Sequence, residues 1–130
     1  MKSGLRSCIP AASAPAPDLA AARKLVLELM AIRGGSGDEK LVAERIVKHL
    51  RDAGCPRDAI AFDTAHTKTP LPGTVGNLIV KFPGTLPGPR RLLMAHMDTV
   101  PVCLGSKPVV AGRFVKSADP ATGLGADDRA

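Results

Sequence analysis

The chain has 130 residues, of which 45% are hydrophobic, so its length and composition fit one domain with a sizeable core. Its formal net charge is +6, but the eighteen Lys and Arg residues are spread along the chain and mixed with acidic residues. Because no dense basic run occurs and only 2% of the residues are aromatic, we expect neither a nucleic-acid partner nor a membrane partner.

The start of the chain and its cysteines indicate the cellular compartment. The first ten residues carry positive charge but lack the apolar core of a signal peptide, and no stretch is long enough to span a bilayer. Cys8, Cys55 and Cys103 are odd in number and have no Cys-x-x-Cys spacing. We therefore expect reduced thiols and a cytoplasmic protein.

The first structural element is expected to follow a flexible leader. Residues 1–17 end in an alternation of Ala, Ser and Pro that cannot bury surface, so we expect the leader there and the domain at residues 18–130. From Asp18 to about Arg33, apolar residues recur at helical spacing, and Gly34-Gly35 supplies a stop. The pattern predicts a first helix.

A second helix is predicted directly afterwards. Ser36 or Asp38 is the expected N-cap, and Gly54 closes the helix before a proline. One apolar stripe is expected to face the core: Val42, Ile46, Leu50 and Ala53. His49 lies beside this stripe, where a histidine is usually structural, and we assign it no catalytic role.

Strands are predicted in the second half of the chain. Short strands are expected at Ile60–Phe62 and within Gly76–Phe82, with His66 solvated in the loop between them. The continuous apolar run Leu92–His96 is typical of a strand covered on both faces, and residues 109–115 suggest a hairpin around Ala111-Gly112. Helices followed by strands, with no repeat and no second-domain boundary, predict a layered α/β fold.

Two groups of residues suggest metal chemistry. His96 stands at the exit of the most apolar strand, where ligands collect in open α/β sheets, and Asp98 could orient its imidazole by a hydrogen bond. Asp127 and Asp128 follow a glycine turn, and one carboxylate can bridge two cations. The alternatives are that Asp98 caps a turn and that the adjacent aspartates begin a helix.

Taken together, the two groups resemble a known family. The sequences His-Met-Asp-Thr-Val-Pro (96–101) and Leu-Gly-Ala-Asp-Asp-Arg-Ala (124–130) look like motifs of the peptidase T-like branch of the dinuclear zinc aminopeptidase, carboxypeptidase and aminoacylase family. The turn at residues 34–39 and Gly-Asn-Leu-Ile at 76–79 also fit, so the resemblance covers about Leu19 to Ala130.

The resemblance implies a fold, two zinc ions and roles for individual residues. The chain would be the amino-terminal part of a three-layer α/β/α catalytic domain, truncated, without the family's lid or dimerisation domain. His96 would ligate zinc, Asp98 would support catalysis, and Asp127 would bridge two ions, followed by Asp128 through a peptide link that the family often holds cis. The substrate would be a small peptide, and the full-length form could be a homodimer.

The family's remaining site residues have no counterpart in this sequence. The family uses an adjacent pair of glutamates, a later acidic residue and a distant histidine, whereas the last glutamate here is Glu44. We therefore expect a tripeptide aminopeptidase-like chain that is inactive alone. The alternatives are an amidohydrolase acting on N-acyl amino acids and a non-catalytic half-domain that serves as an interaction module.

Overall fold

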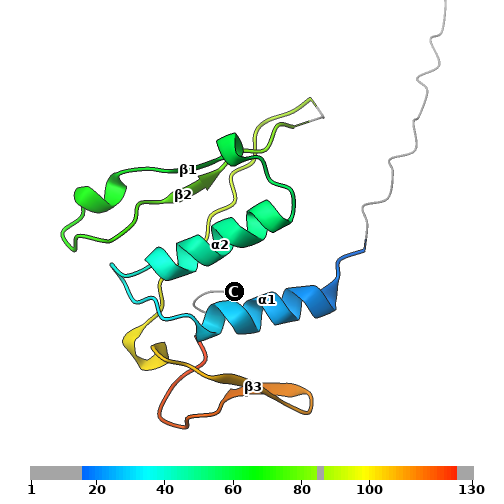
Figure 1. Cartoon of the computed structure of the whole chain (residues 1–130), viewed down its shortest axis with the longest axis vertical. Coiled ribbons are helices and arrows are strands. Elements are labelled where there is room, and N and C mark those ends of the chain that lie inside the picture. Colours follow the sequence, from blue (N-terminus) through cyan, green and yellow to red (C-terminus); the bar gives the residue numbers. More distant parts are fainter. Residues whose placement is uncertain (1–15, 85–86, 126–130) are drawn as a thin grey trace, which may run out of the picture.

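The computed structural model describes residues 16–84 and 87–125, and its two helices lie between two antiparallel hairpins (Figure 1). The regular elements are α1 (Leu19–Ala31), α2 (Lys40–Asp52), β1 (Ile60–Phe62), β2 (Leu78–Val80), β3 (Pro108–Ala111) and β4 (Phe114–Ser117). Neither helix in this part of the chain has the length and apolar composition needed to cross a membrane.

Helix α1 begins where the sequence predicts a helix. The Asp18 carboxylate accepts hydrogen bonds from the backbone N–H groups of Ala20 and Ala21 at 3.0 and 2.9 Å, and so satisfies two of the donors that a helix start leaves unpaired. Met30, in the last turn, is its buried residue. The helix ends at Ala31, shortly before Gly34-Gly35.

Helix α2 confirms the second predicted helix but not its cap. Its N-cap is Glu39, which makes no capping hydrogen bond with its side chain, so the prediction of Ser36 or Asp38 as the cap is wrong. The predicted stripe is confirmed in part, since Val42 is buried and Ile46 and Leu50 are half-buried, but Ala53 is exposed and the other buried residues are Ala43 and Val47. Ser36 does not cap α2 because its hydroxyl donates to Asp98, about sixty residues later, a contact that helical periodicity does not reveal.

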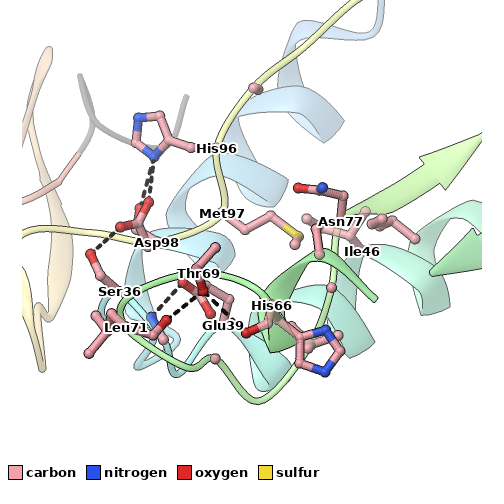
Figure 2. A pocket seen from close by; sticks show the side chains of 17 residues that line it. Ser36, Glu39, Ile46, His66, Thr69, Leu71, Asn77, His96, Met97 and Asp98 are labelled. Atoms are coloured by element: carbon pink, nitrogen blue, oxygen red, sulfur yellow. Dashed lines mark hydrogen bonds and ion pairs between the residues drawn. The ribbon is translucent and has the colours of Figure 1, made fainter. Parts of the chain in front are cut away.

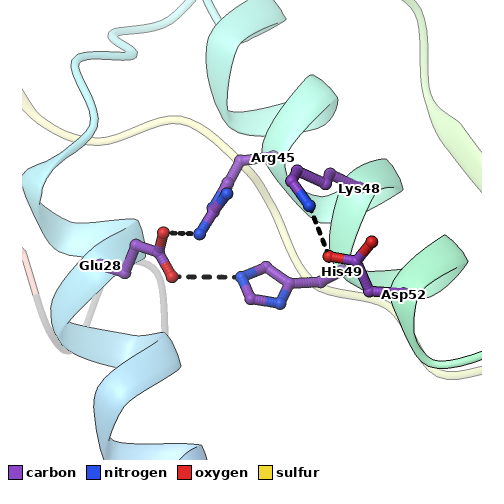
Figure 3. A network of polar contacts seen from close by, with 5 residues as sticks. All are labelled: Glu28, Arg45, Lys48, His49 and Asp52. Carbon is purple, nitrogen blue, oxygen red and sulfur yellow. Dashed lines mark hydrogen bonds and ion pairs between the residues drawn. The ribbon is translucent and has the colours of Figure 1, made fainter.

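An ionic network joins the two helices (Figure 3). Glu28 of α1 forms an ion pair with Arg45 of α2, and its other carboxylate oxygen lies 3.2 Å from Nε2 of His49. These side chains are about one-third exposed, so the network is only partly screened by solvent. His49 therefore contributes to helix packing, in keeping with the structural role predicted for it.

The β1–β2 hairpin is closed by a corner built on Asp63. The Asp63 carboxylate accepts hydrogen bonds from the N–H groups of Ala65 and Asn77 and from the Asn77 amide. A Cβ at Gly76 would lie 2.0 Å from the Asp63 carbonyl oxygen, so only glycine fits the close approach. The strands pair antiparallel with Ile60 opposite Val80, which confirms both predicted strands, the second one shorter than expected.

The β3–β4 hairpin confirms the prediction for residues 109–115. Val110 pairs with Val115, and Ala111 pairs with Phe114 across a turn that contains Gly112 at φ 62°. This hairpin packs next to α1 (Figure 1). The positive φ at Gly112 is the reason that a glycine occupies the turn.

The predicted buried strand Leu92–His96 is wrong in this structure. These residues belong to no strand, and Leu92, Leu93 and Met94 are 80%, 93% and 84% exposed. A strand covered on both faces needs neighbours along both edges and layers above and below it. No described part of the chain supplies them for Leu92–Met94, so these side chains remain in solvent.

The fold is therefore mixed α/β, with a small core. The buried apolar residues are Met30, Val42, Ala43, Val47 and Cys103. Each hairpin is a separate two-stranded sheet, and within the described residues no common sheet joins them. Of the cysteines, Cys55 and Cys103 are free, and Cys8 lies outside the described residues.

Candidate functional site

The predicted site begins where two distant segments meet. The backbone N–H of Thr99 donates to the carbonyl of Gly34 at 2.9 Å, and Gly35 and Thr99 form a parallel β-bridge. Thr99 is buried, with 4% of its surface exposed. This contact brings the turn that follows α1 against the residues that follow His96.

The turn itself is held in shape by its own hydrogen bonds. The Asp38 N–H donates to the Gly35 carbonyl at 2.8 Å, and the Glu39 carboxylate accepts from the Gly37 N–H at 2.7 Å. Gly37 has φ 86°, a conformation that favours glycine. The turn therefore presents the Ser36 side chain at a defined position instead of continuing into α2.

Ser36, Asp98 and His96 form one hydrogen-bonded chain (Figure 2). The Ser36 hydroxyl donates to one carboxylate oxygen of Asp98, and the other oxygen lies 3.1 Å from Nδ1 of His96. Nδ1 also lies 3.2 Å from the backbone carbonyl of Asp98. Because a carbonyl oxygen can only accept, Nδ1 is the donor, and Nε2 of the neutral ring is the nitrogen suited to a metal.

The Asp98 carboxylate is stabilised in its ionised form. The hydrogen bond from Ser36 is the main cause that lowers the pKa of Asp98 below its ordinary value of 3.8; partial burial opposes it, and nearby His96 adds to it. An ionised carboxylate on Nδ1 fixes the tautomer of the imidazole and raises the basicity of Nε2. Asp98 therefore has the geometry of an orienting group.

A cavity of about 570 Å³ lies beside this chain of residues. Ser36, Glu39, His66, Asn77 and Met97 are among the residues that line it, and Figure 2 shows Met97 between Asp98 and Asn77. Its wall combines carboxylates, imidazoles and an amide with apolar side chains. Such a mixture can hold a small polar molecule that has an apolar part.

His66 lines this cavity, which the sequence reading did not foresee. It lies in the short turn Ala65–Thr67 and is partly buried, so the prediction of a solvated His66 is wrong. Its Nδ1 is buried and has no hydrogen-bond partner among the described residues. The Asp63 corner draws the loop back over the cavity, and no local pattern around His66 indicates that contact.

The glycines at the start of the second predicted motif lie close to the first motif. The Gly123 N–H donates to the Val102 carbonyl at 2.9 Å, and a Cβ at Gly125 would lie 2.8 Å from Oγ1 of Thr99. The glycine turn that precedes the two aspartates therefore packs against the residue that follows Asp98. Asp127 and Asp128 lie outside the described residues, and so do the bridging and peptide-link predictions made for them.

The described residues fit a metal site only in part. His96 supplies one imidazole whose tautomer suits ligation, but no group of three His, Cys, Asp or Glu side chains in the described ranges could hold a metal ion. A zinc site normally has at least three protein ligands. His96 is thus a candidate ligand, and Asp98 is its partner.

Ser36 is the other residue whose position sequence reasoning missed. It was expected to cap α2, whereas its hydroxyl binds a carboxylate 62 positions away. The glycines on both sides of Ser36 were the available signal, because they indicate a turn with unusual backbone angles.

Comparisons with known proteins add no family to these observations. No protein-family model matches the sequence, and searches of curated proteins and of solved structures return no match.

Proposed function

We propose that this chain carries the first metal-ligand motif of a zinc-dependent peptidase that hydrolyses amide bonds of small peptides, similar to a tripeptide aminopeptidase. The observation that carries the proposal is the His96 imidazole, whose Nδ1 is bound by the Asp98 carboxylate. A histidine that binds zinc usually donates a hydrogen bond from its other ring N–H to such a carboxylate. The three-layer α/β/α domain belongs to the same proposal.

Two further contacts support the proposal. The hydrogen bond from Ser36 lowers the pKa of Asp98, and an anionic partner makes Nε2 of His96 a stronger ligand. Gly125 packs against Thr99, so the start of the second motif lies next to the residue that follows Asp98. By the resemblance, His96 would bind the metal, Asp98 would orient His96, and Asp127, which lies outside the described residues, would bridge two ions. Zinc would lower the pKa of a bound water and polarise the scissile carbonyl.

The chain alone is expected to be inactive towards peptides. Its three glutamates are Glu28, Glu39 and Glu44, none adjacent to another, so the family's general base has no counterpart. Glu28 is engaged with Arg45, and Glu39 is engaged with the Gly37 N–H. Robust zinc-dependent cleavage of tripeptides by the 130-residue chain would contradict this part of the proposal.

Zinc binding can be tested without any assay of activity. Calorimetric titration with zinc should show weak binding that is lost in His96→Ala and reduced about 10- to 100-fold in Asp98→Asn, because the asparagine no longer carries the charge that strengthens the ligand. His49→Gln is the matched control, since His49 lies in the helix network and should leave zinc binding unchanged. Equal zinc affinity in the wild type and His96→Ala would overturn the proposal.

A further inference from the structure

The cavity beside His96 has an apolar wall and an acidic wall. The acidic wall carries the carboxylates of Glu39 and Asp98 (Figure 2). The cavity volume of about 570 Å³ lies within the range of about 300–1,000 Å³ that is typical of pockets for small organic ligands. A ligand that matches both walls has an apolar group and a polar group. The apolar wall combines side chains of α2, β2, the loop between β1 and β2, and the segment that ends at Asp98: Ile46, Leu78, Leu71, Val75, Ala95 and Met97.

The acidic wall is negative overall. Among the described residues, no Lys or Arg lines the cavity. Glu39 accepts a hydrogen bond from the Gly37 N–H at 2.7 Å and forms no ion pair with the described part of the chain. As the N-cap of α2, Glu39 lies at the positive end of the helix dipole, which offsets about half a charge and leaves the rest. The acidic wall therefore attracts a cation and repels an anion.

One turn anchors both carboxylates of the acidic wall. The Ser36 hydroxyl donates to Asp98, and the N–H of the next residue, Gly37, donates to Glu39. Glu39 is thereby held on the side of the cavity where Asp98 binds His96. In the first residue of a peptide, the amino group and the scissile carbonyl share one Cα, so an anchor for the amino group has to lie near the metal ligand. Glu39 has that position.

We infer that this cavity receives the first residue of a peptide that has a free amino group and an apolar side chain. Glu39 binds the ammonium group, and the apolar wall holds the side chain. An N-acylated amino acid has no ammonium group and ends in a carboxylate, which the acidic wall repels. The inference rests on the proposed function for the reaction, and it selects peptides over N-acyl amino acids as the substrate class.

The experiment is an NMR titration of the metal-free 130-residue chain at about pH 7, where an α-amino group is mostly protonated. L-leucinamide carries both the ammonium group and the apolar side chain. We expect it to bind in about the millimolar range and to shift the amide signals of residues 34–39 and 65–78. Glycinamide lacks the side chain and N-acetyl-L-leucinamide lacks the charge, so each should bind at least about fivefold more weakly. The anion N-acetyl-L-leucine should bind most weakly of the four.

Glu39→Gln tests the anchor for the amino group. Glutamine keeps an oxygen that can accept from the Gly37 N–H but removes the charge, so the turn should persist while L-leucinamide binds at least about fivefold more weakly. Glu44→Gln is the matched control, because Glu44 is exposed on α2, does not line the cavity and loses the same charge. Its affinity for L-leucinamide should equal that of the wild type.

The outcomes separate this inference from the proposed function. The inference is overturned by the absence of saturable L-leucinamide binding, by equal affinity for the acetylated form, by shifts centred outside the cavity, or by unchanged binding in Glu39→Gln. Each of these results can occur while zinc still binds at His96. Conversely, zinc affinity that is equal in the wild type and His96→Ala, together with selective L-leucinamide binding, would overturn the metal site and support the amine site.

Discussion

Helix α2 and the segment Leu92–Asp98 are both rich in apolar residues, yet they have opposite surroundings. Val42 and Ala43 of α2 are 2% and 1% exposed, whereas Leu93 is 93% exposed. The helix satisfies its backbone internally and lies beside α1, its neighbour in the chain. The segment needs strands on both edges before it can be buried. Apolar composition alone therefore does not determine burial. Burial also depends on whether the packing partners of a segment lie close to it in the sequence.

Substitution by lysine should give the largest difference between these two regions. Val42→Lys places an unpaired charge in the core and should lower the free energy of unfolding by about 3–5 kcal/mol, enough to unfold a chain with so small a core. Met94→Lys should change it by less than about 0.5 kcal/mol. Urea unfolding followed by circular dichroism, at a concentration where the chain is monomeric, measures both. A similar loss of unfolding free energy in the two variants would contradict the difference in burial between α2 and Leu92–Asp98.

The Asp63 corner offers an intermediate test, because its partners are about a dozen residues apart. Gly76→Ala brings a methyl group within 2.0 Å of the Asp63 carbonyl and should destabilise the chain by about 1–3 kcal/mol. Gly54→Ala is the control: no atom lies within 4 Å of its added Cβ, and its φ of 88° should cost only about 1 kcal/mol. Thermal unfolding of the two variants compares them. A Gly54 variant less stable than the Gly76 variant would show that the close approach is unimportant.

The sequence predicts correctly the elements whose contacts are short in sequence, and it misses those whose contacts join distant segments. Helix α1, the existence of α2, the strands β1 and β2 and the β3–β4 hairpin were predictable because the apolar periodicity, β-branched runs and turn glycines that indicate them lie within or next to each element. The roles of Ser36 and His66 were not, because they depend on how the 34–39 turn and the 63–77 loop fold towards Asp98. The predicted pairing of His96 with Asp98 was accessible because the two are neighbours on the chain.

The substitution of Ser36 is the test with the smallest expected effect. Removing its hydroxyl in Ser36→Ala should raise the pKa of Asp98 towards 3.8, because the main cause of the lowered pKa is then lost. A carboxyl whose pKa is lower in the folded state adds stability above its unfolded pKa and loses it as pH falls through the folded pKa. Stability below about pH 4 should therefore fall less steeply with decreasing pH in the variant. Carboxyl carbon shifts across an acid titration give the pKa, and an unchanged value would contradict the Ser36 contact.

The most direct measurement is the tautomer of His96. Long-range proton–nitrogen NMR spectra of the imidazole at neutral pH distinguish a ring protonated at Nδ1 from one protonated at Nε2. The account predicts a proton on Nδ1 in the wild type and a mixture of tautomers in Asp98→Ala, with the Nε2 signal of the wild type shifting when zinc is added. A proton on Nε2 in the wild type would contradict the role assigned to Asp98, and with it the basis for the metal site.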